Sequence, residues 1–376
     1  MQTFLIANNK NLEIKTRPEI ELILCCARTH IDDEKVERIK FLIQGNIDWQ
    51  YLIKTAYNHG LMPLLYTNLN TICREAVPEP AFKQLQSLFY TNAQRSLLLT
   101  AELVKILRLV QENDISAVPY KGPVLTNSLY GNVALRQFCD LDIVVQPPDV
   151  LKVKKLLIEQ GYRTELELTE AEEIAYLQDK SKHTYNFIHD GKTILVEIHW
   201  RITPKYISPI EPKHFWEKLE PFSLAGITTS NLPLEEWLLI LCVHGSRHRW
   251  EKLSWPCDIA QLIRLHPAIH WERVIQKASE FDCRRMLFLG LFLAHHLIGV
   301  TLPGEVLQQI KADSEVACLA SEICKELLGE ADARQRFMVK TVYHMRVRER
   351  WHNKLLYFEL FVRWLMKDKN VLLDQK

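Results

Sequence analysis

The sequence carries almost no net charge, since 47 Lys and Arg residues stand against 46 Asp and Glu residues and leave a formal charge of +1. Such a balance gives no electrostatic reason to expect nucleic acid or a membrane surface as a partner. No apolar run reaches the roughly 18 residues that a membrane-spanning helix needs. The opening segment also lacks the basic start and the long apolar stretch of a secretory signal. We therefore expect a cytoplasmic protein without a membrane partner.

Cysteine occurs nine times, an odd number, without the paired spacing of a metal site. We interpret these residues as reduced thiols, which agrees with a cytosolic compartment. The sequence also lacks a nucleophile elbow with Ser-His-Asp or Cys-His partners. A disulfide scaffold, a cysteine metal centre and hydrolysis by a serine or cysteine nucleophile are therefore not expected.

Two histidines one helical turn apart, His244 and His248, have the spacing of a zinc-binding pair. Gly245 and Arg247 stand between them, and the glutamate and third ligand of a zinc-protease motif are missing. We expect that this pair faces a substrate or takes part in structural polar packing. A later run of basic and aromatic residues, 340–354, could contact RNA, although such runs more often form helix surfaces.

Helical periodicity dominates the first third of the chain, returns after residue 212, and leaves about four strands between. The pattern predicts separate helices over 80–89 and 93–112, and a further helix over 165–179. Strands confined to the middle of a mainly helical chain indicate an α+β fold. With 376 residues the chain is long enough for more than one unit, and we divide it into an N-terminal helical region, a central core and a C-terminal helical region, residues 1–112, 113–210 and 211–376.

The central core contains a strand pattern with two carboxylates, Asp140 and Asp142, followed by apolar residues. Side chains alternate across a strand, so both carboxylates share one face while Leu141 and Ile143 face a core. Neighbouring like charges destabilise each other unless a cation lies between them. Such an arrangement suits Mg²⁺, which keeps water and substrate phosphates among its ligands.

Upstream of this strand, residues 118–125 predict a short strand, a tight Lys121-Gly122 turn and a helix that begins at Pro123. The glycine allows a ligand to approach the backbone, and the helix N-terminus favours anions. Lys121 adds a cation at the turn, and Arg136 places a second cation four residues before Asp140.

Downstream, two strand patterns are joined by Asp190-Gly191, a strong hairpin signal. In the second strand, Glu197 and His199 share one face. A glutamate within such an apolar run needs a partner, because burial of an unpaired charge is costly. We therefore expect Glu197 to lie beside a cation or within a polar site.

Together these motifs resemble the nucleotidyltransferase superfamily with the DNA polymerase β-type palm. The Lys-Gly turn, the Arg-x3-Asp-x-Asp strand and the Glu-x-His-Trp strand are similar to a group of uncharacterised bacterial nucleotidyltransferases, over residues 115–200. They are also similar to nucleotidyltransferase toxins that carry Lys-Gly-Gly-Thr followed by Arg-x-Ser-x-Asp-x-Asp. The resemblance implies a small mixed palm sheet flanked by helical regions. It also implies Mg²⁺-dependent transfer of a nucleoside monophosphate from an NTP, with ATP as the expected donor.

The resemblance further implies roles for individual residues. Two Mg²⁺ ions are expected, with Mn²⁺ able to substitute, and the expected catalytic groups and metal ligands are Asp140, Asp142 and Glu197. The expected nucleotide-binding residues are Lys121, Gly122 and Arg136. The expected substrate-binding residues are His199, His244 and His248.

The turn departs from the pattern of many members, which have Gly-Ser or Gly-Gly where this chain has Gly122-Pro123. Proline has no amide N–H to donate, so phosphate binding is expected to depend more on Lys121, Arg136 and the Gly122 amide. The near-neutral charge favours a small-molecule acceptor. A toxin-like enzyme that modifies tRNA or a protein is the alternative, and a catalytically silent palm that acts as a binding module is the third.

Overall fold

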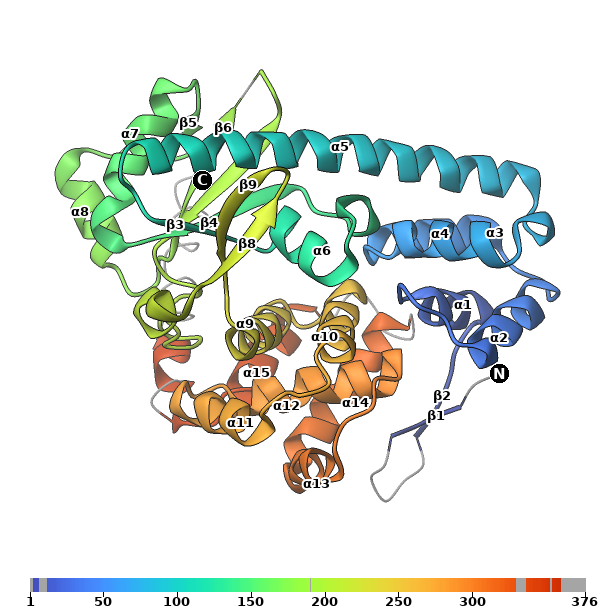
Figure 1. Ribbon diagram of the computed structural model, residues 1–376. Coiled ribbons are helices and arrows are strands. Elements are labelled where there is room, and N and C mark those ends of the chain that lie inside the picture. Colours follow the sequence, from blue (N-terminus) through green and yellow to red (C-terminus); the bar gives the residue numbers. More distant parts are fainter. Residues whose placement is uncertain (1–2, 7–11, 190, 329–335, 352–353, 360–376) are drawn as a thin grey trace, which may run out of the picture.

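The computed structural model describes residues 3–6, 12–189, 191–328, 336–351 and 354–359. A small sheet lies beneath the long helix that ends the first third of the chain and above the helices of the last third, whereas the other helices of the first third lie to its right (Figure 1). The predicted α+β class is confirmed, because one mixed sheet of five strands stands within a mainly helical chain.

The first third of the chain begins with an antiparallel strand pair, β1 (Thr3–Ile6) and β2 (Leu12–Lys15). Helices α1 (Pro18–Cys26), α2 (Asp33–Ile43), α3 (Trp49–Asn58) and α4 (Met62–Ile72) follow. The side chains of Asp32 and Asp48 accept hydrogen bonds from the first-turn amides of α2 and α3. These caps satisfy amide groups that have no partner within the helix, and so they fix where both helices begin.

The next element, α5 (Glu79–Glu112), is a single helix of 34 residues, which corresponds to about 50 Å at about 1.5 Å per residue. The prediction of two helices over 80–89 and 93–112 is therefore wrong. The intervening residues include neither Gly nor Pro, and the Thr91 hydroxyl donates to the Ser87 carbonyl without interrupting the helix. This helix contacts α4 near one end and the central sheet near the other (Figure 1).

The central sheet has the strand order β3-β4-β7-β6-β5. Only β4 and β7 pair in parallel, and the other neighbours are antiparallel. The predicted hairpin is present as β6 and β7, although Asp190 of its turn lies outside the described residues. The strands are β3 (Ala117–Tyr120), β4 (Asp140–Val145), β5 (Arg163–Thr164), β6 (Thr184–His189) and β7 (Ile194–His199).

Helices α6 (Gly122–Tyr130), α7 (Val150–Glu159) and α8 (Glu170–Gln178) connect these strands. The prediction of a helix from residue 165 begins too early, because a capping box formed by Thr169 and Glu172 starts α8 at Glu170. A further antiparallel pair, β8 (Glu220–Leu224) and β9 (Ile227–Asn231), contacts β3. The expectation of helix from residue 212 onward is wrong for this pair, whose Ala225-Gly226 turn has positive φ at both residues.

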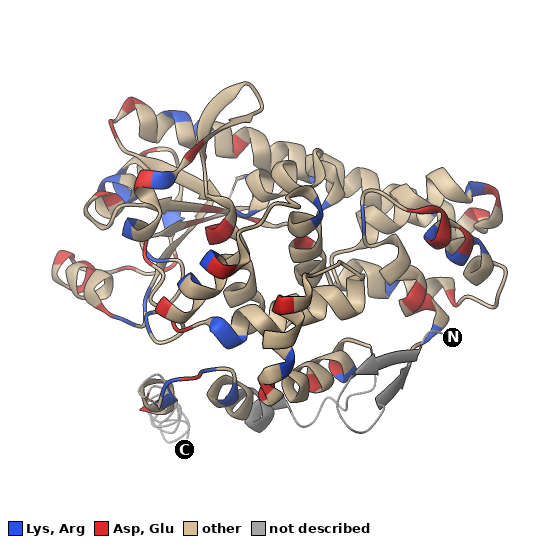
Figure 2. Cartoon of the chain, turned by 60° about the horizontal axis from the view of Figure 1, so that its bottom comes forward, with Lys and Arg blue, Asp and Glu red and all other residues tan. Residues whose placement is uncertain are grey.

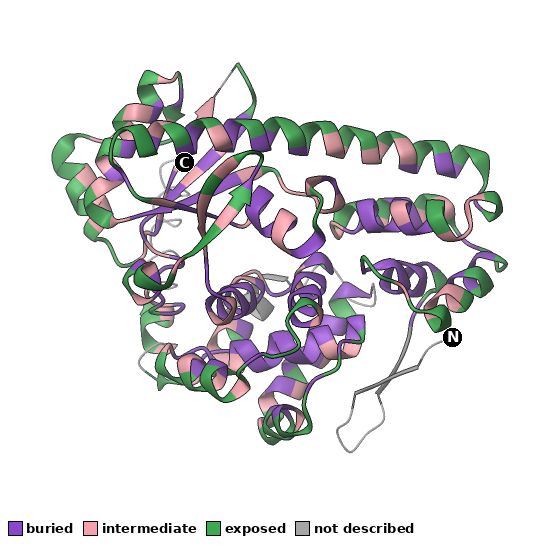
Figure 3. Ribbon diagram, in the orientation of Figure 1, coloured by how far each residue is buried: buried purple, intermediate pink, exposed green. Residues whose placement is uncertain are grey.

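The last third of the chain is helical. It comprises α9 (Leu234–Arg247), α10 (Ser254–Leu265), α11 (Trp271–Glu280), α12 (Arg284–Leu293), α13 (Gly304–Ala312), α14 (Ser314–Leu327) and α15 (Arg336–Arg346). Figure 3 shows that burial is concentrated in α9, α10, α12 and α6, whereas much of α5 is exposed. None of the helices described in the structure has both the length and the apolar character needed to cross a membrane.

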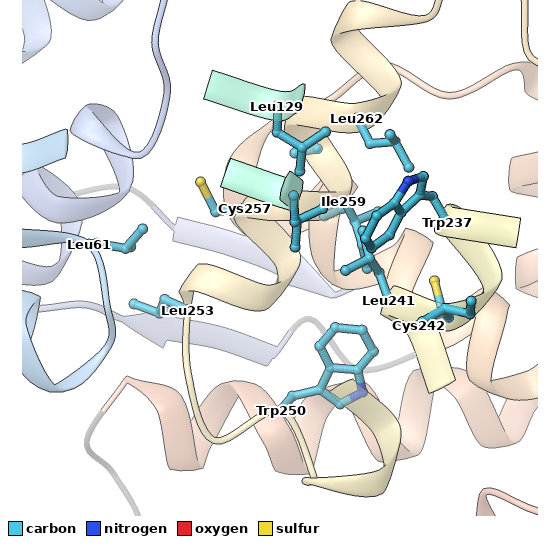
Figure 4. Close-up of a cluster of buried hydrophobic side chains, with 14 of the residues drawn as sticks. Leu61, Leu129, Trp237, Leu241, Cys242, Trp250, Leu253, Cys257, Ile259 and Leu262 are labelled. Atoms are coloured by element: carbon cyan, nitrogen blue, oxygen red, sulfur yellow. The ribbon is translucent and has the colours of Figure 1, made fainter. Parts of the chain in front are cut away.

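Apolar side chains from α6, α9 and α10 form part of the core, which includes Leu129, Leu241 and Ile259 (Figure 4). Trp250 is fully buried beside this cluster. A Cβ atom on Gly245 would lie 2.4 Å from the Trp250 ring, and one on Gly290 would lie 2.9 Å from it. These two glycines therefore leave the space that the indole fills.

The first and last thirds of the chain also contact each other directly. The amides of Leu253 and Ser254, at the start of α10, donate to the ring nitrogen and the carbonyl of His59. The thiol of Cys257 donates to the Ala27 carbonyl at 3.1 Å. The division into residues 1–112, 113–210 and 211–376 stays a prediction.

Candidate active site

Two carboxylates from neighbouring parallel strands meet near the centre of the sheet. The register of β4 and β7 sets Asp142 opposite Glu197. His199 Nε2 lies 3.0 Å from Asp142 Oδ1 and 3.2 Å from Glu197 Oε2. One ligand atom from each of these residues lies within 4.8 Å of the others, so the three could hold a metal ion.

Charges around Asp142 keep its buried carboxyl group ionised. Burial alone would raise the pKa of this group, but the charges and hydrogen bonds of Lys121 and His199 lower it to about 2. Burial acts to lower the pKa of His199, yet contacts with Asp142 and Glu197 hold that pKa above its ordinary value. Carboxylates only accept hydrogen bonds, so Nε2 of His199 carries the proton that faces them.

Tyr120, at the end of β3, holds the other side of the His199 ring. Its hydroxyl lies 3.1 Å from Nδ1 of His199, and the two rings meet edge to face at 5.1 Å. Burial, followed by the charges of Asp142 and Glu197, raises the pKa of Tyr120 well above its ordinary value. The hydroxyl therefore stays protonated and orients the imidazole toward the two carboxylates.

Asp140 lies at the start of β4 and is half-buried. Burial and then repulsion from Asp142 raise the pKa of its carboxyl group to about 6, with a further contribution from Glu197. It does not belong to the three-residue metal group formed by Asp142, Glu197 and His199. The structure thus brings two of the three expected carboxylates into direct proximity and leaves the third within electrostatic range.

The Lys121-Gly122 turn lies beside these carboxylates. Lys121 has φ of 54° and Gly122 has φ of 44°, a region that L-residues with side chains rarely adopt. A Cβ atom on Gly122 would lie 3.3 Å from the backbone oxygen of Asp140. The turn directs Nζ of Lys121 to 3.4 Å from Asp142 Oδ1. Backbone strain of this kind in a non-glycine residue is common at functional sites.

Arg136, an expected nucleotide-binding residue, already has a carboxylate partner. Its guanidinium binds both oxygens of Asp258 at 3.1 Å, and Tyr130 donates to the same carboxylate at 2.7 Å. Asp258 is fully buried in α10. The charge of Arg136 also acts to lower the pKa of Asp140. Its contact with phosphate stays a prediction.

His244, on the last turn of α9, and His248, directly after the helix, lie together and are not members of the three-residue metal group. Their rings are 4.8 Å apart and both pack near Trp255, at 5.3 and 5.6 Å. Burial first, and then nearby cations that include Lys121, lowers the pKa of His244 well below its usual range and that of His248 to about 4. Both are therefore neutral at pH 7, and their proposed contact with substrate is untested.

Sequence patterns gave no indication of His183, which precedes β6. Its Nε2 accepts a hydrogen bond from Nη1 of Arg247 at 2.9 Å, and its ring lies 5.7 Å from the His199 ring. The only signal in the sequence was the position of Arg247 between the two expected substrate histidines. Nothing local links His183 to a residue 64 positions away.

A comparison with protein families identifies the chain over most of its length. The model of the family described as "Uncharacterised nucleotidyltransferase" matches residues 45–299. The chain belongs to this family. No curated protein matches the chain. Membership supports a nucleotidyltransferase activity with an NTP as substrate, and the match extends well beyond the motifs of residues 115–200 into α3, α5 and the helices of the last third.

The residues of this nucleotidyltransferase fit a hard divalent cation in part. Asp142 and Glu197 supply carboxylate oxygens, the ligands that Mg²⁺ and Mn²⁺ prefer. His199 offers a nitrogen, which suits these ions less, and in the structure its Nε2 donates to both carboxylates instead. The donor set therefore favours the carboxylates as ligands and His199 as the residue that orients them.

The arginines of the basic run at 340–354 are used within the nucleotidyltransferase itself. Arg346 pairs with Glu315 and Glu322, both at 2.6 Å, and Arg350 pairs with Asp282 at 3.3 Å. Arg348 is buried and donates to the Tyr206 carbonyl at 3.1 Å. These internal contacts leave little reason to assign this run to RNA.

Proposed function

We propose that this protein transfers a nucleoside monophosphate from an NTP, with ATP as donor, to a hydroxyl group of a small molecule in a Mg²⁺-dependent reaction. The single observation that carries the proposal is the parallel register that sets Asp142 opposite Glu197, with the Lys121-Gly122 turn against Asp142. Family membership supports the reaction type. The cytoplasm is the proposed location.

In the proposed reaction, the acceptor oxygen forms a bond to the α-phosphorus, the bond to the bridging oxygen breaks, and pyrophosphate leaves. Asp140, Asp142 and Glu197 would hold Mg²⁺, which neutralises phosphoryl oxygens and lowers the pKa of a bound hydroxyl when present. Glu197 is the more exposed of the two carboxylates that meet, with 23% of its side chain accessible. It is therefore suited to accept the proton of the acceptor hydroxyl.

The remaining groups act on the donor nucleotide and on geometry. Lys121 would bind phosphate oxygens as a cation, and Gly122 would let them approach the backbone at the start of α6. Arg136 would contribute its charge from the pair with Asp258. Tyr120 would fix the His199 ring, and that ring would hold the carboxylates of Asp142 and Glu197 in place.

A small-molecule acceptor agrees with the charge distribution. Figure 2 shows basic and acidic residues interspersed along the described part of the ribbon, without a broad region of one sign there. A nucleic-acid acceptor generally needs a basic surface that follows the phosphate backbone. The second candidate is a toxin-like enzyme that modifies tRNA or a protein, which rests on the similarity of the Lys-Gly and Asp-x-Asp motifs. The third candidate, a catalytically silent binding module, is disfavoured because all three carboxylates are retained.

Transfer of label tests the proposal and separates these candidates. Each NTP, labelled at the α-phosphorus, is incubated with the protein, Mg²⁺ and a cell extract that is then divided into RNA, protein and small molecules. A new labelled product, distinct from the NTP and its hydrolysis products, is expected in the small-molecule fraction, with none for Asp142→Asn. Label in RNA or protein would favour the toxin-like activity. If no NTP gives transfer to any fraction, the protein would be a catalytically silent binding module.

A further inference from the structure

Arg247 lies on the last turn of α9, half-buried, at the border between the C-terminal helices and the sheet. Its Nη1 donates to Nε2 of His183 at 2.9 Å. Within the described part of the chain, Arg247 forms no ion pair with a carboxylate, although Asp142 and Glu197 lie nearby through the His183–His199 contact. The positively charged guanidinium of Arg247 is thus held by the neutral imidazole of His183.

Two other arginines near this border differ from Arg247. Arg136 binds both oxygens of the buried Asp258. Arg249, two residues after Arg247, is buried and pairs with Glu326 at 2.5 Å. Both charges are matched within the protein, so neither guanidinium is as available to a ligand as that of Arg247.

The position of Arg247 relative to Lys121 follows from the groups between them. His183 contacts Arg247 on one side and the His199 ring on the other, while His199 contacts Asp142, which also binds Lys121. Burial, followed by the charges of both Arg247 and Lys121, lowers the pKa values of His183 and His248, to about 2 and about 4. Both cations therefore act on the same two imidazoles, and Asp142 lies beside them through its contacts with His199 and Lys121.

We propose that Arg247 binds the triphosphate of the donor nucleotide and that His183 is the positioning residue that holds its guanidinium. This inference rests on the proposed nucleotidyl transfer and adds to it a residue from the C-terminal helices. A guanidinium has five N–H donors in a planar fork that matches phosphate. One donor serves His183, which leaves others for phosphate oxygens, while Lys121 contributes a point charge from its place beside Asp142.

The chemistry of His183 suits a positioning role. A carboxylate at this place would neutralise Arg247 and weaken its attraction for phosphate, whereas a neutral imidazole accepts a hydrogen bond and leaves the positive charge in force. Because His183 is buried and lies between cations, its ring stays neutral at physiological pH. A glutamine can also accept a hydrogen bond through its side-chain oxygen, but a phenylalanine cannot.

Calorimetric titration with two probes tests the inference, namely a non-hydrolysable ATP analogue with Mg²⁺ and inorganic tripolyphosphate. Arg247→Gln is expected to weaken binding of both by about 10- to 100-fold, the range for loss of a hydrogen bond between charged groups. The matched control is Arg273→Gln, which removes an exposed arginine of α11 that pairs with Glu235 at 3.7 Å. This control is expected to bind both probes as the wild type does.

The histidine variants test positioning separately from folding. His183→Gln is expected to keep most of the affinity, and His183→Phe to lose much of it with a larger rise in KM for the NTP than fall in kcat. Equal loss in the two variants would remove the positioning role. Thermal melting of each variant shows whether it is folded. If Arg247→Gln does not fold, Arg247→Lys takes its place, because lysine keeps the charge but not the planar fork of donors. Arg247→Lys is expected to lose less affinity for both probes.

Two results would overturn the inference in distinguishable ways. If Arg247→Gln, or Arg247→Lys in its place, has an altered melting temperature but wild-type affinity for both probes, then Arg247 only ties α9 to the sheet and the proposed function stands. If the wild type itself binds neither probe, the proposed nucleotidyl transfer fails, and the assignment of Arg247 fails with it.

Discussion

Asp140 and Asp142 stand two residues apart on β4, yet the protein gives their carboxyl groups different pKa values. Contacts with Lys121 and His199 hold the pKa of Asp142 at about 2, whereas burial and repulsion raise that of Asp140 to about 6. The first shift stabilises the folded state at neutral pH, because the charged form is favoured on folding. The second shift destabilises it, because Asp140 must be ionised in a surrounding that disfavours the charge.

The raised pKa of Asp140 predicts how its removal changes the stability of the protein with pH. Asp140→Asn is expected to raise the free energy of unfolding at pH 7 without divalent cations, and the gain should shrink as the pH falls from about 6 to about 4, where the wild-type carboxyl becomes protonated in both states. Urea unfolding at several pH values measures it. Asp142→Asn is the matched control and should lower stability at pH 7. A gain for Asp140→Asn that does not change with pH would contradict the assigned shift.

Lys121 and Glu197 are predicted to affect different kinetic constants. Lys121 is proposed to bind phosphate in both the ground and transition states, so Lys121→Ala should mainly raise KM for the NTP. Glu197 is proposed to act on the acceptor, so Glu197→Gln should reduce kcat steeply and leave NTP binding nearly unchanged. Calorimetry with a non-hydrolysable NTP decides between the roles, and an equal loss of binding in both variants would show that the two residues form one shared site.

At the scale of elements, the turn between β3 and α6 combines a strained backbone with close packing. Gly122→Ala would place a Cβ atom 3.3 Å from the Asp140 carbonyl at φ of 44°. Gly131, at the end of α6, has φ of 68° but no atom within 4 Å of an added Cβ. Gly131→Ala should therefore cost about 1 kcal/mol from backbone strain alone, whereas Gly122→Ala should cost more and also raise KM.

Urea unfolding and steady-state kinetics of the two alanine variants provide the measurement. The comparison is informative because both glycines bound the same helix and differ mainly in their surroundings. Equal stability and equal kinetics in the two variants would mean that the contact with the Asp140 carbonyl has no consequence for the site.

The strands β3, β4, β6 and β7 could be predicted from sequence because each is a short, largely apolar run rich in β-branched or aromatic residues, and Asp140 and Asp142 alternate with apolar residues in β4. The resemblance to nucleotidyltransferases then implied that β4 and β7 would bring their carboxylates together. The polar strand β9, with Thr228, Thr229 and Ser230, lacks that alternation and was missed. The contact between His183 and Arg247 was also missed, because it depends on how α9 docks against the sheet.

At the scale of the whole molecule, Arg136 and Asp258 join the sheet region to the C-terminal helices through a buried ion pair. Removal of one partner leaves an unmatched buried charge, so Arg136→Met or Asp258→Leu alone should lower the free energy of unfolding by about 3–5 kcal/mol. The double variant should lose much less than the sum of the two losses, because neither charge remains. A double-mutant cycle by urea unfolding measures this, and additive losses would contradict it.

The contacts of His59 with the start of α10 have a consequence for substrate exchange. Helix α5, from the first third of the chain, contacts the sheet. Arg136 pairs with Asp258 of α10, and His59 contacts the start of the same helix. The first third of the chain, the sheet and the C-terminal helices thus each contact the other two. A hinge motion between any two of them would also have to break contacts with the third. We therefore expect nucleotide to enter and leave through movements of side chains and of the turn around Lys121 and Arg247. A rigid-body opening between the three regions is not expected.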